Sequence, residues 1–308
     1  YAASSDGEAV KPPGHQDTIE EMDLVLFGAI DELLLKTGTD ASRIDYVFVN
    51  VSTFSPSPSL ASRLVNHCKM REDVKTYNFS GMGCSAGMIG LEAAKDMLRV
   101  HKDKYAIVIG TENTSTNMYL GNDRSMLVTN CIFRCGSFAL LLSNRRQDRK
   151  TSKLQLLKTV RTNMAASDAA YNVVYLREDE QGHVGASLSV ELLNVAAKAI
   201  TISIMRLIPD FMPSTELLKI ALNTMQRKVL KLKTKPYPLD FKKAFTHFGV
   251  HPGGKVVLDG IGKNLRLSDY DMEPSKMSLY RFGNTSSGGL WYAMSYKEAK
   301  ERLKKGDK

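Results

Sequence analysis

The sequence predicts an α/β fold in which buried strands alternate with amphipathic helices. Short, wholly apolar runs such as 105–110 predict strands covered on both faces. Longer stretches with apolar residues three and four positions apart predict helices. The alternation stops at the basic segment 144–153 and then restarts, so we expect two α/β halves. The predicted regions are a loose segment 1–17, a first half 18–150 and a second half 151–308.

The first half begins with a predicted helix. Thr18-Ile-Glu-Glu21 has the form of a capping box, and the helix that it begins should end near Gly38. Prolines between residues 55 and 59 predict a loop, because proline removes a backbone donor. The other elements expected here are a strand at 46–49, a helix at 59–66, a helix after Cys84, a strand at 105–110, a polar irregular segment at 121–130 and a strand at 138–142.

The second half is predicted from the same patterns. Strands are expected at 154–161, 172–176 and 244–250, and helices at 188–205, 214–230, 253–264 and 285–302. Strands alternating with helices in both halves predict a layered architecture built from two related blocks, although no internal sequence repeat is evident.

The most informative segment is Asn78-Phe-Ser-Gly-Met-Gly-Cys-Ser-Ala-Gly87, in which glycines surround a single cysteine. An amphipathic run follows at once, so the pattern predicts a sharp turn that delivers Cys84 to the start of a helix. Unpaired N–H groups and the positive end of the helix favour a thiolate, and we therefore expect a lowered pKa and a nucleophile. A buried structural cysteine beside a helix start is the alternative interpretation.

Two further segments carry residues suited to chemistry. Phe248-Gly-Val-His-Pro-Gly-Gly254 places His251 at a predicted strand end, and Tyr280-Arg-Phe-Gly-Asn-Thr-Ser-Ser-Gly-Gly289 places Asn284 in a turn before a helix. Taken singly, each has a structural explanation, a hydrogen-bonded histidine or a helix N-cap. Taken with Cys84, they suit covalent acyl transfer, in which imidazole and amide N–H groups stabilise a developing oxyanion. Glu112 is a candidate supporting acid, or simply a capping residue.

Composition narrows the class of protein. Four cysteines in 308 residues do not form a disulfide scaffold, which favours a reducing compartment, and their spacing does not predict a zinc site. The net charge of +9 and the basic clusters at 145–150, 227–235 and 304–308 suit an anionic membrane surface or a phosphate-bearing ligand. Nucleic acid is the weakest partner, because no helix-turn-helix, zinc-finger or aromatic strand motif accompanies the charge.

No run of eighteen uninterrupted apolar residues is present. The nearest, 195–212, is interrupted by Lys198, Arg206 and Asp210, so we do not expect the chain as given to span a bilayer. The chain starts at Tyr1 rather than methionine and ends within a basic run, which predicts a fragment of a longer protein.

Several long motifs resemble the plant 3-ketoacyl-CoA synthases, the condensing enzymes of very-long-chain fatty acid elongation, over about residue 18 to the last residue. They are Gly81-Met-Gly-Cys-Ser-Ala-Gly87, Gly121-Asn-Asp-Arg-Ser-Met-Leu-Val-Thr-Asn130, Leu141-Leu-Ser-Asn-Arg-Arg146, Met272-Glu-Pro-Ser-Lys276 and Arg281-Phe-Gly-Asn-Thr-Ser-Ser287.

The resemblance implies a thiolase-like fold, with two pseudo-repeated α/β halves in αβαβα layers, and a catalytic triad of Cys84, His251 and Asn284. In the implied reaction Cys84 accepts the acyl chain of a long-chain acyl-CoA. Malonyl-CoA then loses CO2 while His251 and Asn284 hold the enolate oxygen, and the carbanion attacks the acyl-enzyme. The product is a 3-oxoacyl-CoA two carbons longer, and no metal, nicotinamide or prosthetic group is implied.

The resemblance also implies partners and a location. It implies a homodimer that works with the reductases and dehydratase of an elongase at the endoplasmic reticulum membrane, with the catalytic domain facing the cytosol. Family members have a membrane-anchoring region of two helices and a final strand with a glycine-rich loop, and we expect this chain to lack both, as if truncated at each end. Val51 stands where the family usually has cysteine.

Three alternatives remain. A papain-like protease uses the same residue types, but it has Trp or Phe beside its cysteine and a disulfide-bearing chain, and neither feature is evident in this sequence. A type III polyketide synthase shares the implied fold and triad but accepts aromatic or short starters. A non-catalytic homologue, acting as a scaffold or dimer partner in an elongase, would need no active Cys84.

Overall fold

The computed structural model describes residues 13–235, 237 and 239–308; the loose segment expected at 1–17 lies largely outside them. Helix α1 (His15–Thr37) begins three residues before the predicted Thr18. The capping box is formed by Gly14 and Asp17, since the Gly14 N–H donates to Asp17 Oδ2 at 2.7 Å, and the prediction at Thr18 is therefore wrong. The predicted end is confirmed by Gly38, which has φ 61°.

A four-stranded sheet in the order β2–β1–β3–β4 forms the centre of the first half. Its strands are β1 (Tyr46–Asn50), β2 (Lys75–Phe79), β3 (Tyr105–Gly110) and β4 (Phe138–Ser143). β1 is parallel to β2 and β3, whereas β4 is antiparallel to β3. Every residue of β1 and β3 is buried, which explains why both strands are continuous apolar runs in the sequence.

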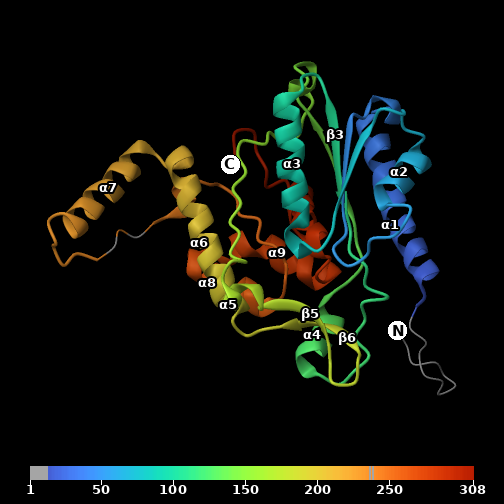
Figure 1. The fold of residues 1–308 in the computed structure, drawn as a ribbon. Helices are drawn as coiled ribbons and strands as arrows, with labels where there is room; N and C mark the ends of the chain where they lie inside the picture. The colour runs from blue at the N-terminus through green and yellow to red at the C-terminus, as the bar shows by residue number, and fades with distance from the viewer. Residues whose placement is uncertain (1–12, 236, 238) are drawn as a thin grey trace.

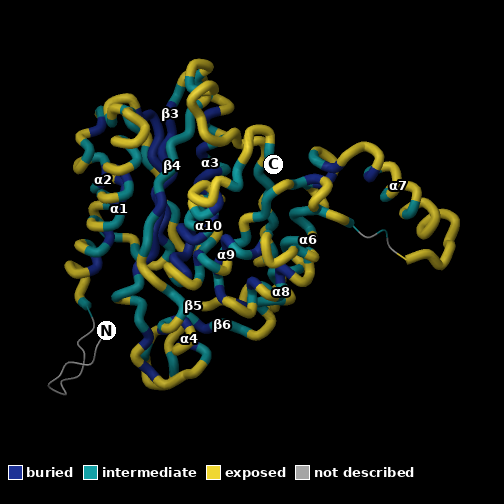
Figure 2. Tube along the Cα trace, turned by 180° about the vertical axis from the view of Figure 1, so that it is seen from behind, coloured by how far each residue is buried: buried dark blue, intermediate teal, exposed yellow. Residues whose placement is uncertain are grey.

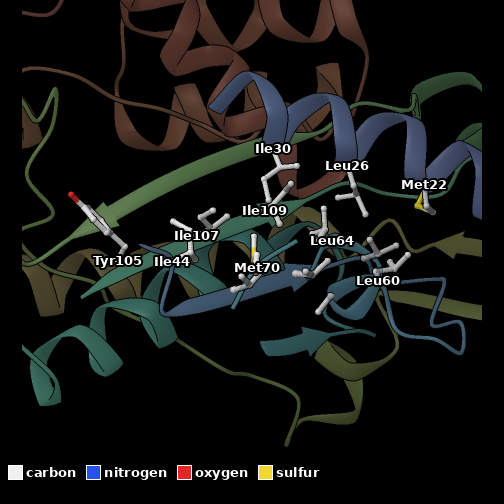
Figure 3. Close-up of a cluster of buried hydrophobic side chains, with 14 residues drawn as sticks. Met22, Leu26, Ile30, Ile44, Leu60, Leu64, Met70, Tyr105, Ile107 and Ile109 are labelled. Atoms are coloured by element: carbon white, nitrogen blue, oxygen red, sulfur yellow. The ribbon is translucent and has the colours of Figure 1, made fainter. Parts of the chain in front are cut away.

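Helices cover both faces of this sheet (Figure 1). Helices α1 and α2 (Leu60–Cys68) cover one face, where Met22, Leu26 and Ile30 of α1 pack over Ile107 and Ile109 of β3 (Figure 3). Helix α3 (Ala86–Val100) covers the other face, on which the intervening side chains of β3 lie. The first half is thus a three-layer α/β unit, as the sequence predicts.

The segment predicted to be irregular at 121–130 is instead helix α4 (Arg124–Ile132). Asp123 accepts a hydrogen bond from the Ser125 N–H at 2.8 Å, which caps the helix, and Met126 and Thr129 are buried. The polar composition concealed this helix, because only two of its nine side chains face the interior.

The second half is mostly helical. It contains α5 (Asp168–Tyr171), the antiparallel hairpin β5 (Val174–Glu178) and β6 (Val184–Leu188), α6 (Leu192–Phe211), α7 (Ser214–Lys228), α8 (Lys255–Leu265), α9 (Asp269–Phe282) and α10 (Gly289–Ala299). Short 3-10 turns occur in both halves of the described chain. The first half contains η1 (Ala41–Arg43), η2 (Gly83–Ser85) and η3 (Gln147–Lys150), and the second half contains η4 (Phe241–Lys243) and η5 (Ser286–Gly288). Four helices lie close to their predicted positions, and α9 was not predicted.

The strands predicted at 154–161 and 244–250 are wrong. In the second segment the backbone groups pair with other partners: the N–H groups of Thr246 and His247 both donate to Lys308 O, and the Val250 N–H donates to Ser275 Oγ. The first segment is largely exposed. Within the described residues neither segment has a neighbouring strand with which to form a ladder, so an apolar pattern alone was insufficient.

Helix α6 is the one helix in the described part of the chain that is long and apolar enough, by length and composition alone, to cross a membrane. Two of its three charged residues have partners on the protein: Asp210 pairs with Lys158, and Arg206 Nη1 donates to the Arg161 carbonyl at 3.0 Å. Ile208 is its only fully buried residue, and much of its surface is half-buried.

Candidate functional site

Cys84 lies in the tight turn η2, between the end of β2 and the first residue of α3. Gly81 and Gly83 adopt the left-handed backbone conformation, with φ 69° and 58°. The turn is tied to the segment after β1, because the Gly81 N–H donates to the Ser52 carbonyl at 2.9 Å and Ser52 Oγ donates to the Gly83 carbonyl at 3.3 Å. The predicted turn-to-helix geometry is confirmed.

Asn284 lies opposite the Cys84 turn, in the turn before η5, and the residue is 2% exposed. Its backbone forms an isolated bridge with Phe133, and its side chain is held at both ends. Nδ2 donates to the Gly253 carbonyl at 3.1 Å, while Oδ1 accepts from the Ser286 N–H at 2.9 Å. Asn284 therefore joins the segment after α4, the η5 turn and the loop that carries His251.

His251 lies on that loop rather than at a strand end. Its Nε2 atom is buried and has no hydrogen-bond partner among the described residues. The ring packs against the start of α10, where a Cβ on Gly289 would lie 3.5 Å from His251 Cε1. Burial lowers the pKa of His251 to about 4, so the imidazole is neutral at pH 7.

The thiol of Cys84 is enclosed by the η5 turn. Burial raises its pKa, hydrogen bonding by Ser286 lowers it, the negative charge of Glu112 raises it and hydrogen bonding by Asn284 lowers it. The net shift is upward, so the expected lowering of the pKa by the helix N-terminus is wrong: desolvation outweighs it. The resting group is a thiol that needs a proton acceptor.

Glu112 connects the segments around Cys84. This carboxylate, 6% exposed, accepts from the N–H groups of Ser52 and Thr53 at 3.1 Å, from Thr53 Oγ1 at 2.7 Å and from Ser286 Oγ at 3.2 Å. Glu112 lies two residues after the end of β3, as Ser52 lies two residues after the end of β1. Sequence analysis identified Glu112 but missed Thr53 and Ser286. Two features of the sequence could have identified them: Thr53 lies just beyond the carboxyl end of a parallel strand, and Ser286 lies in the Asn284 turn.

We expect Cys84 to react slowly with iodoacetamide at pH 7, and its rate to keep rising above about pH 8.5, where an ordinary thiol levels off. The reason is the upward shift of its pKa by burial. Peptide mass spectrometry of alkylation time courses from pH 6 to 10, with N-acetylcysteine as reference, measures this. A rate that is already constant at pH 7 would contradict the thiol assignment.

One group of metal-ligand side chains occurs in the described residues, Asp31, His67 and Cys68. It lies on the face of the sheet covered by α1 and α2, away from α3 and Cys84 (Figure 1). His67 Nε2 lies 2.9 Å from Asp31 Oδ1, and the ring stacks on Phe27 at 4.0 Å, so packing and a hydrogen bond account for the arrangement. That the protein holds no metal stays a prediction.

Two family models together match residues 5–308 of the chain. A profile described as FAE1/type III polyketide synthase-like protein matches residues 5–229, and one described as the C-terminal domain of chalcone and stilbene synthases matches residues 186–308. Among curated proteins of Arabidopsis thaliana, 3-ketoacyl-CoA synthase 11 is 48% identical over 296 residues and 3-ketoacyl-CoA synthase 2 is 50% identical over 299. Each alignment covers 96% of this chain but only 58% and 57% of the respective relative.

Solved structures show the same fold. PKS-I from the brown alga Ectocarpus siliculosus aligns with a TM-score of 0.67 at 20% identity, over 99% of this chain and 76% of that one. CsyB complexed with CoA-SH aligns with a TM-score of 0.69 at 16% identity, over 97% and 77% of the two chains. The predicted thiolase-like α/β fold is confirmed. In the described residues its sheet content is unequal, with four strands in one sheet and a two-stranded hairpin in the second half.

Proposed function

The chain belongs to the FAE1/type III polyketide synthase-like family, and we propose that it forms the condensing centre of a 3-ketoacyl-CoA synthase. The proposed reaction joins a long-chain acyl-CoA to malonyl-CoA and gives a 3-oxoacyl-CoA two carbons longer. The curated relatives at 48% and 50% identity carry that name, and the chain spans less than three fifths of their length.

The observations that carry the proposal are the enclosure of Cys84 by Ser286 and Asn284 and the loop of His251, which Asn284 holds through the Gly253 carbonyl. The buried Nε2 of His251 has no hydrogen-bond partner in the part of the chain that the structure describes. A thiol with amide and hydroxyl groups around it, at the first turn of a helix, suits the formation and collapse of an oxyanion on a thioester. A purely structural cysteine would not explain why a buried imidazole nitrogen has no partner among the residues described, because unpartnered buried polar groups are costly.

In the first half-reaction the Cys84 sulfur attacks the thioester carbon of the acyl-CoA. Because burial keeps the cysteine protonated, its proton must move as the S–C bond forms, and neutral His251 is the proposed acceptor. The bond from carbon to the CoA sulfur then breaks, and the leaving CoA thiolate takes the proton. The acyl chain remains on Cys84 as a thioester.

In the second half-reaction malonyl-CoA loses CO2, and the electron pair of the broken C–C bond forms a thioester enolate. We propose that Asn284 Nδ2 and a His251 N–H donate to the enolate oxygen. A neutral imidazole suits this role, because it stabilises the oxyanion and is too weak an acid to quench it. The enolate carbon attacks the acyl thioester and releases the Cys84 thiolate, which takes a proton from water and returns to the resting thiol. Decarboxylation drives the sequence, so the proposal includes no metal, nicotinamide or prosthetic group.

We propose further that the whole protein works as a homodimer with elongase reductases and a dehydratase at the endoplasmic reticulum membrane, its catalytic domain facing the cytosol. The support is the family and the names of the relatives.

Starter selection separates this function from that of a type III polyketide synthase. The longest natural form of the protein should be incubated with radiolabelled malonyl-CoA and either a C18 acyl-CoA or coumaroyl-CoA. We expect label in a 3-oxoacyl product with the long-chain starter only. Label incorporated mainly with coumaroyl-CoA would favour the polyketide synthase alternative and contradict the proposal.

A further inference from the structure

Helix α7 and the segment that follows it extend away from the body of the protein (Figure 1), and most of their residues are exposed (Figure 2). Four apolar side chains lie along one face of the helix at spacings of four, three and four residues: Leu218, Leu222, Met225 and Val229. They are 60%, 45%, 46% and 70% exposed. Leu230 and Leu232 continue the apolar surface and are 56% and 50% exposed. Exposed apolar side chains aligned on one face of a helix mark a surface that binds a partner.

The charge around this stripe has a single sign. Between residues 217 and 239 there are six basic residues and no acidic one, and five of the six lie within 227–235. All five are exposed: Arg227, Lys228, Lys231, Lys233 and Lys235. The surface therefore combines an apolar stripe with a dense positive charge at its outer end.

The base of the helix is firmly attached. On the face opposite the stripe, Leu217 and Ile220 pack against a cluster formed with Ile208 and Met212. Buried Glu216 pairs with Lys219 and Lys243 and accepts from the Tyr237 hydroxyl at 2.7 Å. The helix is thus held at one end, and its apolar stripe and basic outer end are directed away from the core.

We propose that α7, together with residues 229–235, is an interfacial element that binds an anionic lipid surface. An amphipathic helix with leucines on one face and lysine and arginine beside them inserts its apolar side chains at the headgroup boundary, while the cations meet lipid phosphates and carboxylates. Nucleic acid would use the cations but would leave the apolar stripe exposed to water. The inference does not rest on the proposed enzymatic function, since it uses no residue of the Cys84 site.

Vesicle flotation tests the inference on the chain as it is. The purified protein is mixed with vesicles of phosphatidylcholine alone or with about 30% phosphatidylserine. We expect binding to the anionic vesicles, weakening as salt is raised, and at least tenfold weaker binding to the neutral ones. The variant K228E/K231E/K233E should lose at least tenfold in affinity for the anionic vesicles.

Two further variants make the result decisive. Leu222→Gln with Met225→Gln removes apolar surface without changing charge, and it should also weaken binding by several-fold. The matched control, R146E/R149E/K150E, makes the same change in net charge on exposed residues outside α7 and should bind within twofold of wild type. Circular dichroism checks that each variant is folded. Equal loss in the control, full binding by the K228E/K231E/K233E variant, or binding of duplex DNA without vesicle binding would each overturn the inference.

Discussion

Replacing Cys84 with alanine is expected to abolish condensation, lowering the rate at least about a thousandfold, because the substitution removes the sulfur that we propose accepts the acyl group. The overall fold should persist, since the substitution removes only one atom, the sulfur, from the side chain. Condensation of radiolabelled malonyl-CoA with a long-chain acyl-CoA measures the effect in the longest natural form of the protein.

The matched control is Cys131→Ala, which removes an exposed cysteine in α4 and should leave the rate within twofold of wild type. Elongation in cells gives an independent outcome. If the Cys84→Ala protein supported elongation as well as wild type, the protein would be a scaffold or dimer partner, and the enzymatic proposal would be wrong.

Removal of the Glu112 carboxylate is expected to cost about 3 to 5 kcal/mol of unfolding free energy. Glu112→Ala leaves the N–H groups of Ser52 and Thr53 and the Thr53 hydroxyl, which form part-buried hydrogen bonds, without their acceptor. It also releases Ser286 from the network. Urea unfolding of both proteins measures the difference.

The control for stability is Glu72→Ala, at an exposed position, for which we expect a change within about 0.5 kcal/mol. Glu112→Gln adds a readout of the site itself. Because the negative charge of Glu112 raises the pKa of Cys84, the neutral amide should move the alkylation profile of Cys84 to lower pH. A Glu112→Ala protein as stable as wild type, with an unchanged Cys84 profile in Glu112→Gln, would contradict the role assigned to this network.

Local patterns were sufficient for three of the four strands of the first half, whereas β2 and α4 were not predicted. The strands at 46–49, 105–110 and 138–142 were predicted within one residue, because continuous apolar runs bounded by polar segments leave little choice of structure. The Cys84 turn could also be predicted, since glycines at 81 and 83 allow the left-handed backbone conformation of a tight turn before a helix.

Features that depend on residues distant in the sequence could not be predicted from local patterns. The segment 244–250 has the composition of a strand, yet its N–H groups bond to Lys308 and Ser275, which lie far away in the sequence. The raised pKa of Cys84 also depends on distant residues: the helix start favours a thiolate locally, but the η5 turn, some 200 residues later, buries the sulfur. The convergence of Glu112, Ser286 and Cys84 is likewise a tertiary property.

The most direct measurement of the central claim is the mass of the Cys84 peptide after exposure of the protein to a long-chain acyl-CoA. We predict a gain equal to the acyl group on this peptide, removable by hydroxylamine, with none on the peptide containing Cys131. The gain should be strongly reduced in His251→Ala. An unmodified Cys84 peptide after prolonged incubation, or equal acylation of Cys84 and Cys131, would contradict the claim that this thiol is the acyl acceptor.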